Sequence, residues 1–137
     1  MVIPSTIEDY PVVEIRGQAF ERSNVTSVVV HPGIKKIGQV AFANCPNLTT
    51  AILPDTLDKI ERDTFHGCSS LHTVNLPAGL RVLGNSIFYN CGELYNLSIP
   101  DSITALTWDG GSQFRGCGKL KLTTRQRLKD LGYTGNF

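Results

Sequence analysis

Short apolar segments recur along this chain at a fixed spacing. In each segment β-branched or aliphatic residues alternate in facing and turn residues follow directly, a pattern typical of a short strand. The four segments occupy residues 28–30, 51–53, 74–76 and 97–99. They are 23 residues apart, so we expect four strands at equivalent positions of one repeating unit.

Further apolar positions keep the same period. Two aliphatic columns follow the segments: Ile34, Leu57, Leu80 and Ile103, then Ile37, Ile60, Leu83 and Leu106. A phenylalanine comes next, with a cysteine three residues later: Phe42 with Cys45, Phe65 with Cys68, Phe88 with Cys91, and Phe114 with Cys117. Self-similarity at this period predicts stacked coils with these columns in the core, because no single unit can bury its apolar face alone.

Three departures from the period predict irregular segments. One residue is missing after Phe20, which places Ser23 in the cysteine column. Residues 7–12 carry about five extra residues ahead of a normal continuation. Three residues are added between Leu106 and Phe114, around Trp108. Gly-Gly beside Asp in that insertion is typical of a loop, so we expect it to bulge from the outer side of its coil.

The pattern changes near the C-terminus and predicts a helical cap. Residues 123–132 have Thr123 as the expected N-cap, apolar residues three apart and a glycine just past the end. Arg125 and Arg127 would then oppose the helix dipole from the first turn, so packing must hold the helix. We expect a solenoid of about five coils over residues 1–122 and a capping helix and tail over 123–137.

Composition and charge narrow the class of protein. The 137 residues are 41% hydrophobic with a formal net charge of +1, which suits one globular domain. Nucleic-acid and anionic-membrane binding need a marked basic excess, so neither partner is expected. A membrane span is not expected either, because no apolar stretch approaches the roughly 20 residues required. Residues 1–4 have neither the charged start nor the apolar core of a signal peptide.

The repeat resembles the BspA-like leucine-rich repeats. That unit is a cysteine, a leucine three later, a short aliphatic strand ending in proline, an Ile-Gly pair and then Ala-Phe. Ile37-Gly38 with Ala41-Phe42-Ala43-Asn44-Cys45 is the most similar stretch, and the opening of the chain also resembles the start of such arrays. The departures, which leave every core column intact, are Glu61 and Thr107 in the Gly38 column, Thr64 and Ile87 in the Ala41 column, and the insertion around Trp108.

The resemblance implies an architecture and a broad role. The fold would be an α/β repeat solenoid, a right-handed coil with a parallel β-sheet on its concave side and irregular or short helical segments on the convex side. Members of the family are mainly surface or secreted binding modules of microbes and protists, without catalysis in the repeat. A shared fold identifies no partner, so the partner and the compartment stay open.

Candidate chemistry is sparse in this chain. The four cysteines share one column with Ser23, which favours buried free thiols, with a disulfide between coils or a metal site as alternatives. His66 and His72 flank Cys68 in sequence, but their spacing supplies no catalytic dyad. We therefore expect no enzyme activity, no catalytic residues, no metal and no cofactor. A basic cluster from Arg115 to Lys129 is interpreted as a solvated cap.

The predicted function is recognition of another protein, of unknown identity, on the concave sheet. One row of side chains per coil should face outward there. The candidate binding residues are Thr49, Thr50, Ile52, His72, Thr73, Asn75, Tyr95, Asn96 and Ser98. Thr26, Ser27 and Val29 extend the same face. Two alternatives remain: a structural subunit that self-associates end to end through its N-terminal coil, and a cell-surface adhesin repeat.

Overall fold

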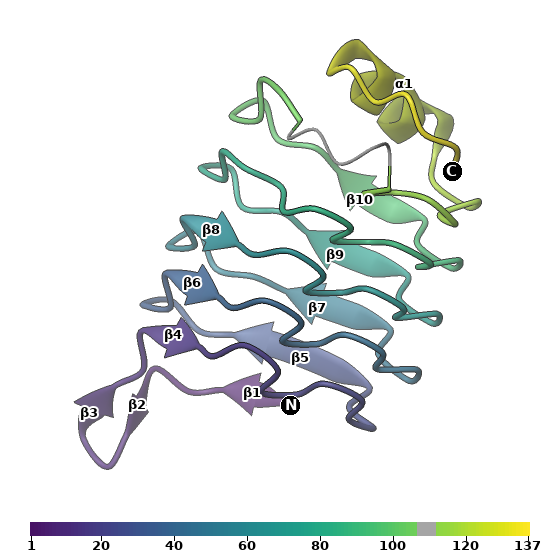
Figure 1. Ribbon diagram of the computed structural model, residues 1–137. Helices are drawn as coiled ribbons and strands as arrows, with labels where there is room; N and C mark the ends of the chain where they lie inside the picture. The colour runs from purple at the N-terminus through teal and green to yellow at the C-terminus, as the bar shows by residue number, and fades with distance from the viewer. Residues whose placement is uncertain (107–111) are drawn as a thin grey trace.

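The computed structural model, described here for residues 1–106 and 112–137, is a parallel β-solenoid of about four turns (Figure 1). Its long sheet has five parallel strands in the order β1-β5-β7-β9-β10. These strands are β1 (Val2–Ile3), β5 (Ser27–Val30), β7 (Thr50–Ile52), β9 (Thr73–Asn75) and β10 (Asn96–Ser98). Thr50 pairs with Thr73, and Asn96 pairs with the same residue from the other side, so each turn advances the chain by one repeat. The strands predicted from the apolar segments are confirmed, although β7, β9 and β10 each begin and end one residue earlier than predicted.

A second parallel sheet runs along another side of the coil. It consists of β4 (Glu14–Ile15), β6 (Lys36–Ile37) and β8 (Lys59–Ile60), and an isolated bridge from Ile60 to Leu83 extends it. The sequence indicated Ile37, Ile60 and Leu83 only as inward-facing positions. Strands of two residues are too short for the alternation that identifies a strand.

The extra residues near the N-terminus form a projecting hairpin. Strands β2 (Thr6–Ile7) and β3 (Tyr10–Pro11) pair antiparallel, with Ile7 opposite Tyr10 (Figure 1). Glu8 and Asp9 join them with φ angles of 49° and 67°. Positive φ at both central residues defines the type I′ turn, whose twist matches that of a two-stranded ribbon.

A stack of phenylalanine rings runs through the core of the solenoid. Successive rings are 5.2 to 5.7 Å apart between centroids and tilted by 4° to 29°. The stack consists of Phe20, Phe42, Phe65, Phe88 and Phe114. Tyr133 closes it edge-on, at 5.6 Å and 88°. Phe42, Phe65, Phe88 and Phe114 are fully buried, so the predicted phenylalanine core column is confirmed.

The segment around each phenylalanine, which we call an arm, is built from hydrogen-bonded turns. The helix α1 (Leu122–Asp130) is the sole helix of the described residues. Two positions in each of the arms around Phe20, Phe42, Phe65 and Phe88 take a left-handed backbone. Asn44 and Asn90 share one of these positions with Gly67 and Gly116. Asparagine and glycine tolerate positive φ better than other residues, which explains their recurrence at this corner.

The helix α1 (Leu122–Asp130) covers the end of the solenoid next to β10 (Figure 1). Thr123 is not its N-cap: Lys121 holds that position, with no side-chain cap. The Thr124 hydroxyl instead donates to the main-chain oxygen of Leu97, 2.6 Å away in β10. A polar side chain inside the first turn therefore ties the helix to the sheet.

The end of α1 agrees with the predicted glycine stop. Gly132 has a φ of 94°, and the N–H of Tyr133 donates to the Leu128 oxygen at 2.9 Å, the bond of a Schellman motif. Because the helix begins at Leu122, Arg127 lies in the last turn rather than the first, where a cation favours the helix. The predicted packing is confirmed, since Leu128 and Tyr133 are buried and Leu131 is half-buried. No described helix has the length and apolar character needed to cross a membrane.

Candidate functional site

The predicted binding residues all lie along the outer face of the long sheet. Within the strands, the buried residues Ala51, Val74 and Leu97 alternate with outward-facing neighbours. The candidate residues are exposed or half-buried: Thr49, Thr50, Ile52, His72, Thr73, Asn75, Tyr95, Asn96 and Ser98. The structure thus places the nine side chains on one continuous face, which we call the sheet face.

The row that contains Tyr95 continues the sheet by one residue beyond the strands. The N–H of His72 donates to the Thr49 oxygen at 2.9 Å, and the N–H of Tyr95 donates to the His72 oxygen at 3.2 Å. Backbone bonds thus fix the spacing of these side chains from coil to coil. A row on regular backbone is positioned more precisely than one on a free loop.

The ring of Tyr95 lies between a histidine and a lysine. The His72 ring is 5.7 Å from it, tilted by 33°, and the Lys121 Nζ lies 5.0 Å from its centroid. Lys121 Nζ also donates to the Asn96 Oδ1 at 3.2 Å, and the His72 Nδ1 lies 3.1 Å from the Thr73 hydroxyl. Stacking and the cation–π contact hold the ring in one orientation, although Tyr95 is 45% exposed.

Lys121 was missed in the sequence analysis, although the sequence carries a signal for it. It follows Tyr95 by 26 residues, the same offset that separates Phe88 from Phe114. When the three inserted residues are added to the period of 23, the residue equivalent to Tyr95 in the next coil is Lys121. Its position in the basic cluster suggested a cap residue instead.

Asn75 differs from its neighbours on the sheet face because its side chain is committed to the backbone. Its Oδ1 accepts from the Leu53 N–H at 2.8 Å, and its Nδ2 donates to the Leu53 oxygen at 2.9 Å. The amide thereby joins β9 to the chain just after β7. Nearby, a hollow of about 200 Å³ lies between Thr73, Asn75, Asn96 and Ser98. Ligand pockets usually span about 300–1,000 Å³, so this hollow suits one side chain of a protein partner.

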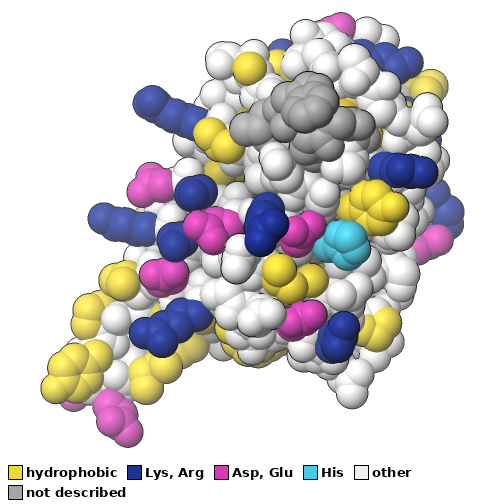
Figure 2. All heavy atoms as spheres, viewed as in Figure 1, with side chains coloured by type: hydrophobic (Ala, Val, Ile, Leu, Met, Phe, Trp, Pro, Cys, Tyr) yellow, Lys and Arg dark blue, Asp and Glu magenta, His cyan; other side chains and the backbone are white. Residues whose placement is uncertain are grey.

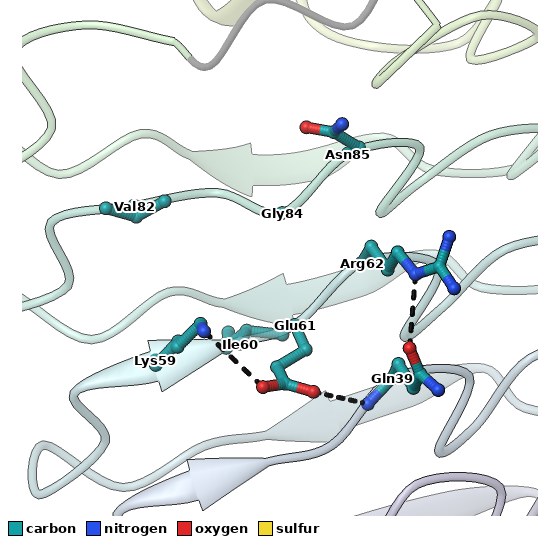
Figure 3. A pocket seen from close by; sticks show the side chains of 8 residues that line it. All are labelled: Gln39, Lys59, Ile60, Glu61, Arg62, Val82, Gly84 and Asn85. Atoms are coloured by element: carbon teal, nitrogen blue, oxygen red, sulfur yellow. Dashed lines mark hydrogen bonds and ion pairs between the residues drawn. The ribbon is translucent and has the colours of Figure 1, made fainter.

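A second hollow, of about 340 Å³, lies beside the short sheet (Figure 3). It is lined by Gln39, Lys59, Ile60, Glu61, Arg62, Val82, Gly84 and Asn85. The Glu61 carboxylate accepts from the Gln39 N–H at 3.1 Å and lies 3.4 Å from the Nζ of both Lys36 and Lys59.

The cations around Glu61 determine its ionisation. Partial burial acts to raise its pKa, but Lys59, the Gln39 N–H and Lys36 together lower that pKa below its ordinary value. An ionised carboxylate with three donors is a poor proton acceptor. Through Gln39 and Lys36, Glu61 joins its own coil to the preceding one. The preceding coil has a glycine, Gly38, at the equivalent position, which could not make these contacts.

The cysteine column forms a ladder of thiol hydrogen bonds. Each Sγ donates to the main-chain oxygen of the phenylalanine one coil earlier, at 3.0 to 3.1 Å. The bonds join Cys45 to Phe20, Cys68 to Phe42, Cys91 to Phe65, and Cys117 to Phe88. All four cysteines are buried free thiols, and the Ser23 hydroxyl extends the column 3.5 Å from the Cys45 Sγ. A cysteine here thus supplies a donor as well as small apolar bulk.

The structure does not assemble a nucleophile around Cys68. A hydrogen bond with Cys45 and burial both raise the pKa of the Cys68 thiol, so it stays protonated. The His66 ring stacks on Tyr89 at 4.9 Å, and its Nδ1 lies 3.5 Å from the Asp63 carboxylate. Over residues 1–106 and 112–137, no group of three or more His, Cys, Asp or Glu side chains is placed to hold a metal ion.

Much of the basic cluster is engaged within the cap. Arg125 donates to the oxygens of Leu120 and Gly118, and Arg127 donates to the Ile103 oxygen at 3.0 Å. Lys119 pairs with Glu93 at 2.6 Å. These arginines satisfy carbonyl groups at the end of the solenoid. The loop around Trp108, the other candidate outside the sheet, lies in residues 107–111, outside the described residues.

These features define a leucine-rich-repeat β-solenoid, a class of protein for which protein binding is a typical role. The chain belongs to the BspA family: the sequence model described as "BspA type Leucine rich repeat region" matches residues 2–132 in six copies. No curated protein matches the chain.

Solved structures of bacterial leucine-rich-repeat proteins share this fold. The Treponema pallidum protein TpLRR is 26% identical with a TM-score of 0.73, over 99% of this chain and 84% of that one. A leucine-rich-repeat protein from Bacteroides ovatus is 32% identical with a TM-score of 0.63, over 88% of this chain and 38% of that one. The pneumococcal vaccine antigen PcpA is 28% identical with a TM-score of 0.63, over 77% of this chain and 30% of that one.

Proposed function

We propose that this protein is a non-catalytic binding module that recognises another protein on its sheet face, centred on Tyr95 and His72. The observation that carries the proposal is the placement of the Tyr95 ring between His72 and Lys121. The ring contacts a residue from the coil on each side of it, and its exposed part is available to the partner. A ring fixed before binding loses little conformational entropy on association.

The character of the surrounding surface supports a protein partner. Tyrosine is among the residues that carry most interface energy, whereas threonine and serine adapt their hydrogen bonds and contribute less area. The right-handed coil and concave sheet implied by the family would curve the rows toward a convex partner. BspA-type repeat proteins are commonly surface or binding proteins, and one of the similar solved structures is that of a pneumococcal vaccine antigen.

The test compares variants against a partner identified by pull-down from the native organism. Tyr95→Ala should weaken affinity at least tenfold, about 1.4 kcal/mol. Tyr89→Ala is the matched control, because Tyr89 also stacks on a histidine of the previous coil but away from the sheet face. Unchanged affinity of Tyr89→Ala would separate recognition from a general loss of stacking.

Two further variants test the competing surfaces. Lys129→Ala probes the basic cap better than Arg125→Ala, because Arg125 holds two carbonyl groups and its removal disturbs the cap itself. Trp108→Ala probes the inserted loop. If only one of these changes weakens binding while Tyr95→Ala binds normally, the sheet-face proposal is wrong.

A further inference from the structure

The two most exposed large hydrophobic side chains of the described residues lie at opposite ends of the solenoid. Tyr10, in β3, is 76% exposed, and Leu122, at the start of α1, is 81% exposed. Figure 1 places β3 and α1 at the two extremes of the coil. Apolar surface left open in this way marks an interaction site when it is part of a larger patch.

At the N-terminal end, Tyr10 is part of such a patch. Met1, Val2, Ile7 and Val13 are also exposed, by 42% to 60%. Figure 2 shows hydrophobic side chains gathered on the projecting hairpin. A shallow groove of about 530 Å³ is lined by Ile7, Glu8, Tyr10, Pro11, Val12, Val13, Glu14 and Arg16. We call this surface the N-terminal groove.

The groove adjoins unpaired strand edges. In the described residues β1 ends the long sheet and β4 ends the short one, so each has a neighbour on one side only. At the other end, α1 covers the sheet, and its outer surface therefore faces any molecule stacked there.

The outer surface of α1 carries one apolar residue among polar and basic ones. Leu122, Gln126 and Lys129 are exposed and recur at i, i+4 and i+7, so they lie along one stripe of the helix. We call this stripe the cap face. Lys121 directly precedes Leu122, and Arg125 lies about one turn of the helix after it.

The two ends differ in the sign of their charge. Residues 7–16 contain three carboxylates, Glu8, Asp9 and Glu14, against one guanidinium, Arg16. Glu14 bonds to Lys36 at 3.2 Å yet keeps 43% of its side chain exposed. The segment 119–130 contains five basic residues against Asp130. Opposite charges around the two apolar surfaces favour contact between an N-terminal end and a C-terminal end. Like charges disfavour contact between two identical ends.

From this complementarity we propose that the protein self-associates head to tail, with the cap face of one copy seated in the N-terminal groove of the next. Leu122 packs against Ile7, Tyr10 and Val13, while Lys129 of the cap face approaches Glu8 and Asp9. A heterologous contact of this kind leaves one groove and one cap face free, so assemblies grow into open chains. The contact uses neither Tyr95 nor His72 and leaves the sheet face open.

Sedimentation velocity of the 137-residue protein tests the proposal. The weight-average mass should rise past that of a dimer as concentration increases, and added NaCl should reduce it, because salt screens the charges around the contact. Tyr10→Ser and Leu122→Ser should each raise the dissociation constant at least tenfold. Val82→Ser is the control, since Val82 is 42% exposed at mid-solenoid and should leave association unchanged.

Mixing the two variants determines the orientation. Tyr10→Ser keeps an intact cap face and Leu122→Ser keeps an intact groove, so an equimolar mixture should form dimers and nothing longer. Both changes lie at exposed positions, and unchanged circular dichroism melts verify folding. A monomer at every concentration, a mass insensitive to salt, or disruption by Tyr10→Ser without any effect of Leu122→Ser would overturn the proposal.

Discussion

The thiol of Cys68 donates a hydrogen bond to the main-chain oxygen of Phe42, 3.0 Å away in the preceding coil. The same bond recurs at Cys45, Cys91 and Cys117, so the cysteine column satisfies a row of buried carbonyl groups. Leaving a buried acceptor without a donor costs about 1–3 kcal/mol. The repeated cysteine therefore has a structural explanation that needs neither a metal nor a disulfide.

We predict that the four cysteines are reduced and inaccessible in the folded protein. Thiol titration should find four reactive groups after denaturation and few before it, because all four side chains are buried. A peptide map under non-reducing conditions provides the counter-test. A bridge between Cys45 and Cys68, or between Cys91 and Cys117, would contradict the prediction.

The buried thiol of Cys117 should also make stability depend on alkaline pH. Burial raises the pKa of Cys117 to about 12, whereas an unfolded thiol ionises near pH 8.5. Above about pH 8.5 the unfolded chain releases a proton that the folded chain retains, so stability falls as pH rises toward the folded pKa. Below that pH the contribution is fully present.

Urea denaturation at pH 7 and 9.5 measures this effect. Each thiol with a raised pKa should lower the free energy of unfolding by up to about 1.4 kcal/mol between these two values. Cys117→Ala removes one such group, so its stability should fall less over the same range. An equal fall in the variant and the parent would show that Cys117 does not contribute.

Phe65 should be among the most sensitive core positions. Its ring is fully buried and stacks on Phe42 and Phe88, each at 5.7 Å. Truncating a buried phenylalanine costs about 3–5 kcal/mol, comparable to the whole stability of a small domain. Phe65→Ala should therefore unfold or nearly unfold the protein in a thermal melt.

Phe20→Ala is the matched comparison for Phe65→Ala. Phe20 ends the stack, is half-buried and contacts one ring at 5.2 Å. It should lose less stability, because less apolar surface is exposed and the end of the coil can relax. A melting temperature of Phe65→Ala within a few degrees of the parent would mean that the stack is not the core.

Gly84 should tolerate no side chain. A Cβ at this position would lie 2.6 Å from the Arg62 nitrogen and 2.7 Å from the Glu61 oxygen, both main-chain atoms. Gly84→Ala should thus push neighbouring coils apart and cost about 1–3 kcal/mol, as overpacking usually does.

Gly79→Ala controls for the change in backbone entropy. A Cβ at Gly79 meets no atom within 4 Å, so this variant should match the parent or gain about 0.4–1 kcal/mol. Chemical denaturation of both variants gives the comparison. Equal stability of the two would show that the coils are spaced more loosely at Gly84 than the structure indicates.

Only part of the candidate site follows from the sequence. The alternation around Ala51, Val74 and Leu97 places the outward residues correctly, because a strand with one buried face has period two. The alternation could not distinguish Asn75, whose amide bonds to Leu53, from Asn96, whose amide accepts from Lys121. Both are exposed asparagines on strands, and only the neighbouring coil decides what each contacts.

The fixed repeat of phenylalanine, cysteine and aliphatic positions determined the coil, its period, its core columns and its family. A unit that cannot bury its own apolar face has to stack, so periodicity alone specifies the architecture. The tertiary structure decided the features that depend on adjacent coils: the thiol ladder, the short second sheet and the order of His72, Tyr95 and Lys121. It also decided the start of α1, since Thr124 bonds to Leu97 in β10. Each of these rests on residues more than twenty positions apart, whose contacts depend on how consecutive turns align in space.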